Sequence, residues 1–342
     1  MGVIMRDMTP DNILNAFDSS MLLPRISRFP LIPIAAILIT TVTVADDSAI
    51  RELRFEPTDQ RRSRIVPVKV YLENSRTPSP VVLFSHGLGG SRENNAYLGR
   101  HWAAAGYVAV FIQHAGSDIE VIKSARVGRK LAALKAAISA AASRDRFTDI
   151  PFVIDQLSAW NKQEGHELRG KLNLERIGMS GHSYGAVTTL AVAGRKFALN
   201  QSFPDDRIDA FFAMSPQPGK GIAPARAFGD ISKPFLCMTG TKDASPVDST
   251  MKPSDRQKVY AAFPGGDKYQ LVLDGGEHMA FGDSRGLRTR GRDPKHHPAI
   301  QEISLHFWDA YLKADADSKR WLQSRRPLTE TGLGDADMWG WK

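Results

Sequence analysis

One glycine-flanked serine constrains the fold of this chain more than any other short segment. Ser183 is the central residue of GHSYG (181–185), between the apolar runs at 174–180 and 186–194. Glycines two residues before and after a serine suit a sharp strand-to-helix turn, in which the serine side chain is pushed out of the backbone. The flanking positions favour glycine because a Cβ atom would meet the chain where it doubles back. The segment predicts a strand, a strained turn and a helix.

The rest of the chain alternates between strand-like and helix-like segments. Apolar runs typical of buried strands lie at 65–72, 80–87, 107–114, 174–180, 207–215, 233–240 and 269–276. Helical patterns lie at 94–106, 129–146, 148–161, 186–194, 255–264 and 299–313. Strands that alternate with helices favour the α/β class, with a mostly parallel central sheet and helices on both faces. No Pro/Ser-rich linker or repeat interrupts the pattern, so we expect a single domain over 46–342.

The first 45 residues have the features of an export signal. Arg25 and Arg28 precede the apolar run at 31–45, which ends at Ala45. A charged segment, an apolar stretch and a small residue in this order are typical of a secretory signal peptide. An uncleaved membrane anchor is the alternative, although a spanning helix needs about 20 apolar residues. We therefore expect a periplasmic or secreted protein.

Charge and cysteine content exclude some functions. The formal net charge is +8, which favours anionic surfaces or substrates, but no zinc-finger spacing, RNP-like aromatic motif or repeat indicates nucleic-acid binding. The single cysteine, Cys237, cannot form an intramolecular disulfide and is expected to be a buried, inert thiol.

A serine needs a base to become a nucleophile, and His278 is the predicted base. It follows the last predicted strand in the glycine-rich segment LVLDGGEHMAFGD. In folds of this type the acid and then the histidine follow the serine, on loops at the carboxyl ends of strands. His182 lies inside the turn and is expected to point away. The later histidines, His296, His297 and His306, are better explained as surface or core residues.

An acid must orient the imidazole, and Asp243 is the predicted acid. It follows the strand-like run at 233–240, after the serine and before the histidine. Asp248, five residues further on, is the alternative. Asp209 begins a strand, which is the wrong end for a site, and Asp274 is expected only to cap a loop.

The oxyanion of an acyl-transfer reaction needs backbone donors. One is expected from the N–H of Tyr184, the residue after the predicted nucleophile. The other is expected from Leu88, in the glycine-rich loop FSHGLGGS (84–91) that follows an early buried strand. Removal of one such donor typically costs about 3 kcal/mol of transition-state stabilisation.

The loop and the turn also carry a resemblance to a known family. VVLFSHGLGGSR (81–92) and IGMSGHSYGAVT (177–188) resemble segments of the platelet-activating factor acetylhydrolases and of the bacterial predicted dienelactone hydrolases. HAGSD (114–118) and FTDIPFVIDQL (147–157) are similar to the bacterial group. The similarity covers about residues 65–313.

This resemblance implies an α/β-hydrolase fold, with Ser183 as nucleophile, His278 as base, and Leu88 and Tyr184 as oxyanion donors. Two departures are visible. Dienelactone hydrolases use a cysteine nucleophile, where this chain has serine. In the animal acetylhydrolases the acid follows an earlier strand, where this chain has Ser215 in FFAMSPQ and no carboxylate.

The sequence therefore predicts a serine ester hydrolase acting on carboxylic esters, short-acyl lipid esters among them, without a metal or cofactor. An acyltransferase or amidase with the same residues, or a non-catalytic binding protein, are the alternatives. The partner is a small-molecule or lipid ester. Two segments leave contact with a membrane surface open: the Ala-rich stretch 126–146, a lid or a solvated helix, and the basic stretch 284–297. The sequence does not indicate an oligomeric state.

Overall fold

The computed structural model of this chain contains a nine-stranded sheet, and several of its strands are buried along their whole length. The structure describes residues 50–219, 221–283 and 293–342, all within the compact unit Ala45–Lys342. The predicted signal at 1–45 and most of the basic stretch 284–297 lie outside the described residues. Among the helices described, none is both long enough and apolar enough to cross a bilayer.

The sheet is mostly parallel, as predicted. Its order is β1-β4-β6-β5-β7-β8-β9-β10-β11. The strands from β6 to β10 run parallel, whereas β1, β4 and β11 pair antiparallel with their neighbours. The bounds are β1 Arg51–Phe55, β4 Val68–Leu72, β5 Ser79–Ser85, β6 Val108–Ile112, β7 Leu172–His182, β8 Ala210–Met214, β9 Phe235–Lys242, β10 Lys268–Glu277 and β11 Met338–Trp341; β2 (Thr58–Asp59) and β3 (Arg64–Ile65) form a separate pair.

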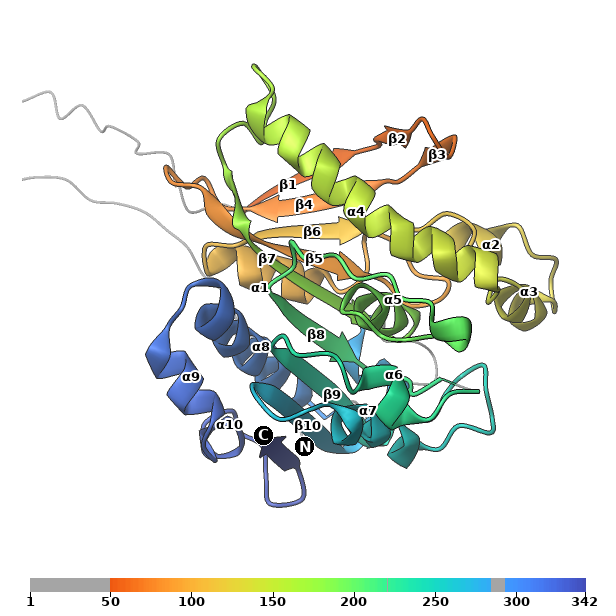
Figure 1. Cartoon of the computed structure of the whole chain (residues 1–342), viewed down its shortest axis with the longest axis vertical. Coiled ribbons are helices and arrows are strands. Elements are labelled where there is room, and N and C mark those ends of the chain that lie inside the picture. The colour runs from red at the N-terminus through yellow and green to blue at the C-terminus, as the bar shows by residue number, and fades with distance from the viewer. Residues whose placement is uncertain (1–49, 220, 284–292) are drawn as a thin grey trace, which may run out of the picture. The chain divides into compact units, whose positions relative to one another are not determined.

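Helices cover both faces of the sheet, as predicted (Figure 1). One face packs against α4 (Ala140–Lys162), α5 (Tyr184–Val192), α6 (Pro224–Phe228) and α7 (Gln257–Ala262). The other packs against α1 (Ala96–Ala104), α8 (His296–Leu312), α9 (Ala316–Leu322) and α10 (Arg326–Thr329). Single turns of 3-10 helix lie at Ala198–Asn200, Pro253–Arg256 and His278–Phe281.

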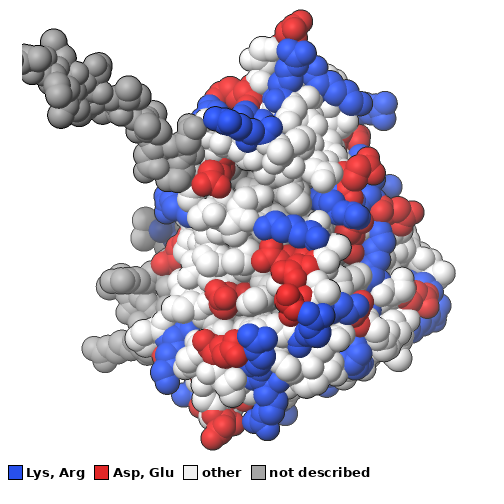
Figure 2. Space-filling view, turned by 90° about the vertical axis from the view of Figure 1, so that its left-hand side faces the viewer, with Lys and Arg blue, Asp and Glu red and all other residues white. Residues whose placement is uncertain are grey.

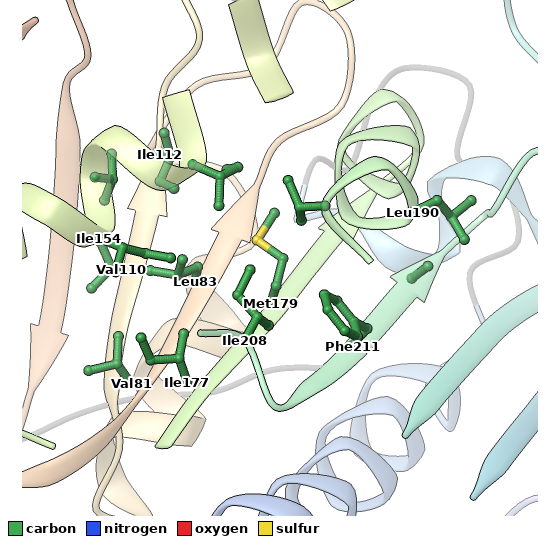
Figure 3. Packing of buried hydrophobic residues seen from close by; sticks show 14 of the residues in the cluster. Val81, Leu83, Val110, Ile112, Ile154, Ile177, Met179, Leu190, Ile208 and Phe211 are labelled. Carbon is green, nitrogen blue, oxygen red and sulfur yellow. The ribbon is translucent and has the colours of Figure 1, made fainter. Parts of the chain in front are cut away.

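The period of two along each strand divides the core into two clusters. Val81 and Leu83 of β5 point into the cluster beneath α4 and α5, which also contains Met179 and Ile154 (Figure 3). The intervening Val82 and Phe84 point into the cluster beneath α1 and α8. A sheet buried on both faces explains the near-continuous apolar runs of its strands.

The predicted helices at 129–146 and 148–161 are divided differently in the structure. The Ala-rich stretch is interrupted after α3 (Lys130–Ala136), which follows α2 (Ile119–Lys123). Ser139 then caps α4 by accepting a hydrogen bond from the N–H of Ala142 at 3.0 Å. From there α4 continues through Pro151, so the two predicted helices are joined. The expectation of one uninterrupted helix over 129–146 is therefore wrong.

Charge is distributed without a dominant basic area on the face shown in Figure 2. Lysine and arginine side chains alternate there with aspartate and glutamate. In the part of the chain that the structure describes, several charged side chains form exposed ion pairs, such as Arg54–Glu93 and Arg207–Asp155. Exposed pairs of this kind contribute little to stability.

Candidate active site

Ser183 occupies a strained turn between β7 and α5. Its backbone has φ 58° and ψ −113°, a region that residues other than glycine rarely adopt. A Cβ on Gly181 would lie 2.4 Å from the carbonyl oxygen of Gly185, and a Cβ on Gly185 would lie 1.8 Å from that of Ser85. The two glycines are therefore required by close backbone approach, as the sequence predicted. The turn places the Ser183 side chain at the carboxyl end of the sheet.

The structure brings Ser183, His278 and Asp243 together. The Nε2 atom of His278 lies 2.9 Å from Ser183 Oγ, and its Nδ1 atom lies 2.7 Å from Asp243 Oδ1. Asp243 comes directly after β9 and His278 directly after β10. Because β7, β9 and β10 belong to one run of parallel strands, their carboxyl ends meet at the same edge of the sheet.

Asp243 is buried and held on both oxygens. Thr239 Oγ1 donates to Oδ2 at 2.9 Å, while Arg256 Nε lies 2.9 Å from Oδ1. Burial alone would raise the pKa of Asp243, but the hydrogen bond with His278 and the charge of Arg256 outweigh it and lower the pKa below its ordinary value. Asp243 is therefore ionised at neutral pH.

The tautomer of His278 follows from its neighbours. Arg256 Nη2 lies 3.2 Å from Nδ1, but a guanidinium can only donate. The carboxylate of Asp243 is closer to Nδ1 and carries the opposite charge. A proton on Nδ1 that is donated to Asp243 satisfies this geometry and leaves Nε2 to accept the proton of Ser183 Oγ–H.

His182 does not point away from the site, contrary to the expectation from its place inside the turn. Its ring packs against that of His278 with centroids 4.8 Å apart, and its Nε2 atom donates to the carbonyl oxygen of His278 at 3.0 Å. Burial and the neighbouring His278 lower the pKa of His182 to about 3. His182 is thus a neutral side chain that supports the backbone of His278.

The two predicted oxyanion donors flank the serine. Tyr184 is the first residue of α5, where backbone N–H groups have no partner within the helix. On the opposite side, a Cβ on Gly87 would lie only 3.4 Å from Ser183 Cβ, so the glycine loop sits against the turn. In that loop the N–H of Gly89 donates to the carbonyl oxygen of Ser117, and the N–H of Gly90 donates to the carbonyl oxygen of Gly87. Within the described residues, Leu88 N–H has no backbone acceptor.

A pocket of about 330 Å³ opens over Ser183. Besides Ser183 and His278, its walls come from the glycine loop, from α3 and from the loop after β9: Gly87, Leu88, Gly89, Gly90, Asn94, Asn95, Leu131, Leu134, His182, Pro246, Val247, Met279, Gly282 and Asp283. Most of the exposed lining is apolar. The α3 residues Leu131 and Leu134 belong to the stretch 126–146, so part of that stretch lines the pocket.

The alternative acids lie elsewhere. Asp248 accepts hydrogen bonds from the backbone and hydroxyl of Thr250 and lines a separate cavity. Asp209 accepts a hydrogen bond from Ile177 N–H, and Asp274 accepts one from Thr241 Oγ1.

The later histidines are surrounded by other side chains of the fold: His297 stacks on Tyr97, His306 stacks on Trp321, and His296 is buried at the start of α8.

Sequence reasoning missed the buried polar partners of the site. Arg256 lies in an ordinary charged segment, SDRQKVY, and nothing in that pattern distinguishes it from a surface arginine.

Cys237 is buried, as expected, and burial raises the pKa of its thiol. Within the described ranges, no three His, Cys, Asp or Glu side chains are grouped so that they could hold a metal ion.

Comparison with known proteins supports the fold alone. No family model matches the chain, and no curated protein matches it. A solved structure of a ferulic acid esterase from Streptomyces cinnamoneus is similar, with a TM-score of 0.55 and 18% sequence identity; the match covers 78% of this chain and 90% of that one. The strand order, the helices on both faces and this likeness show that the chain has the α/β-hydrolase fold.

Proposed function

We propose that the chain is a serine hydrolase of carboxylic esters that works through an acyl-enzyme. The observation that carries the proposal is the continuous hydrogen-bonded chain from Ser183 Oγ through His278 to Asp243. It ends at a strained serine beneath a pocket, which is the arrangement that nucleophilic acyl transfer requires.

In the proposed reaction, His278 Nε2 takes the Ser183 proton as Oγ attacks the ester carbonyl. The N–H groups of Leu88 and Tyr184 bind the oxyanion of the tetrahedral intermediate. When this intermediate collapses, His278 returns the proton to the leaving alcohol. The same base then activates a water molecule, whose attack frees the acid and Ser183. Asp243 keeps Nδ1 protonated and stabilises the imidazolium.

The pocket favours modest acyl or aryl groups. Its volume of about 330 Å³ is at the lower end of small-molecule sites, and Leu131, Leu134 and Val247 make part of its wall apolar. The structural neighbour is named as a ferulic acid esterase, so an ester of an aromatic acid belongs in any substrate panel. Short-acyl lipid esters are a further class to test.

The test is hydrolysis of p-nitrophenyl acetate, butyrate and octanoate and of methyl ferulate by wild-type protein, Ser183→Ala and Ser254→Ala. Ser254 is exposed and serves as the matched control. We expect hydrolysis by the wild type and the control, and a loss of at least about 10⁴-fold in Ser183→Ala. A fluorophosphonate should modify Ser183. Folded wild-type protein with neither hydrolysis nor this adduct would overturn the proposal in favour of a binding role.

A further inference from the structure

A second serine–histidine–aspartate chain lies beside the proposed active site. Ser85 Oγ is 2.9 Å from His114 Nε2, and His114 Nδ1 is 2.9 Å from Asp149 Oδ2. All three residues are fully buried, and none lines the pocket. His114 and Asp149 come from HAGSD and FTDIPFVIDQL, which the proposed reaction does not use.

This second chain is arranged to hold Ser85 rather than to activate it. Arg146 Nη2 donates to Ser85 Oγ at 2.9 Å. Because the serine oxygen accepts from a cation, its own proton is directed at His114 Nε2, and the His114 Nδ1 proton is directed at Asp149. Arg64 closes the chain with paired 2.9 Å hydrogen bonds to Asp149.

Arg146 connects the two elements that carry the proposed oxyanion donors. On the loop side, it donates to the carbonyl oxygen of His86, two residues before Leu88. On the helix side, Nε donates to Thr188 Oγ1 at 3.1 Å and the guanidinium lies 4.5 Å from the centre of the Tyr184 ring. Its remaining arm, Nη1, donates to Ser117 Oγ at 2.9 Å.

The same loop is fixed on its far side. Gly89 N–H donates to the carbonyl oxygen of Ser117, and His86 Nε2 accepts from the N–H of His114 at 3.0 Å. The side chain of Arg146 is fully buried. Burial lowers its pKa to about 10, so it stays charged at neutral pH. A buried cation is costly unless its donors are satisfied. Those of Arg146 go to Ser85 and Ser117 and to one acceptor in each of the two elements that carry the proposed oxyanion donors.

We propose that Arg146 is a positioning residue for the oxyanion hole, which sets the distance between Leu88 N–H and Tyr184 N–H. The Asp149–His114–Ser85 chain holds one of its acceptors in place. The inference rests on the proposed ester hydrolysis and deepens it. Because Arg146 does not line the pocket, its loss should weaken transition-state binding and leave substrate binding unchanged.

The test compares Arg146→Met and Arg146→Lys with Arg144→Met, a matched control on the exposed side of the same helix. We expect kcat to fall by about 10–100-fold in Arg146→Met with KM within about twofold, which is less than the loss of a whole donor. Arg146→Lys should have a higher kcat than Arg146→Met, because lysine keeps the positive charge but lacks the planar set of N–H donors of the guanidinium. Arg144→Met should behave as wild type.

A second measurement separates positioning from a general structural role. A trifluoromethyl ketone forms a tetrahedral adduct on serine, so its Ki should rise by the same factor as kcat falls. Urea titration gives the folded fraction of each variant. If Arg146→Met does not fold, Thr188→Val removes one acceptor at nearly constant volume and should lower kcat by about 3–10-fold.

The outcomes are distinguishable. An active wild type whose folded Arg146→Met or Thr188→Val variant keeps kcat, or shows only a raised KM, would overturn the inference and leave the proposed function standing. Wild-type protein that forms no fluorophosphonate adduct at Ser183 would overturn the proposed function and the inference with it.

Discussion

The two serine–histidine–aspartate chains use the same residue types at nearly the same distances, yet they differ in backbone and surroundings. Ser183 lies in a strained turn with a positive φ under a pocket, whereas Ser85 ends β5 in regular register with Gly181. The Oγ atom of the first chain's serine therefore faces a pocket, whereas the second chain is enclosed within the protein. Connectivity alone does not make a nucleophile; a strained turn and an open pocket are needed as well.

The two chains also differ in where a buried arginine contacts them. Arg256 lies against the carboxylate end of the first chain, at Asp243, and leaves Ser183 Oγ to His278. Arg146 lies against the hydroxyl end of the second chain and donates to Ser85. A cation at the acid keeps the acid ionised, while a cation at the hydroxyl occupies the oxygen that would have to attack.

Asp243→Asn should break the first chain and give the largest effect. An amide cannot hold the His278 tautomer that leaves Nε2 free, and loss of this orientation typically lowers kcat by about 10⁴-fold. The measurement is kcat for p-nitrophenyl acetate, with Asp248→Asn as the control. Activity retained in Asp243→Asn but lost in Asp248→Asn would move the acid to Asp248.

Asp149→Asn should break the second chain, with the main effect on stability. Asp149 is the shared partner of His114, Arg64 and Arg62, whose Nη1 lies 2.8 Å from Oδ1. Removing one partner of a buried charged pair typically costs about 3–5 kcal/mol. Urea unfolding of Asp149→Asn and of the half-exposed control Asp145→Asn measures this cost. We expect the folded variant to keep kcat within about tenfold; a far larger loss would mean that Asp149 takes part in the reaction.

The sequence predicted the parts of the fold that depend on local pattern. Continuous apolar runs located β5, β6, β8, β9 and β10, and two glycines located the turn at Ser183, because each signal resides in adjacent residues. The edge strands β1 and β11 were missed. RELRF and MWGW have little strand pattern of their own, and they become strands by pairing with β4 and β10, far away in the chain.

The same limit applies to the site. Ser183, His278 and Asp243 could be proposed because each follows a recognisable strand, so that topology places them at one edge. Arg256 and Arg146 could not, because a buried arginine in a helix has the same local sequence as an exposed one. The helix break before Ser139 was hidden for a related reason: the Ala-rich run favours helix on both sides of it.

The pH dependence of stability offers a finer comparison of the two chains. Burial lowers the pKa of His114 from 6.5 to about 4, whereas in the unfolded chain the imidazole keeps its ordinary pKa. Between these values the unfolded state binds more protons, so the stability associated with neutral His114 is complete above pH 6.5 and is lost as the pH falls towards 4. The lowered pKa of Asp149, set by hydrogen bonds from His114 and Arg64 that outweigh burial, acts with the same sign but only below its ordinary value of 3.8.

At pH 5 the loss from His114 alone should be about 2 kcal/mol relative to pH 7.5. His114→Gln keeps a polar side chain but cannot be protonated, so the difference in unfolding free energy between these two pH values should shrink by about that amount. His182→Gln, beside the first chain, should give a reduction of the same sign, because burial lowers the pKa of His182 to about 3. Urea titrations at pH 5.0 and 7.5 measure both. A pH difference unchanged by His114→Gln would mean that folding leaves the pKa of His114 at its ordinary value, and the stability assigned here to neutral His114 would then be wrong.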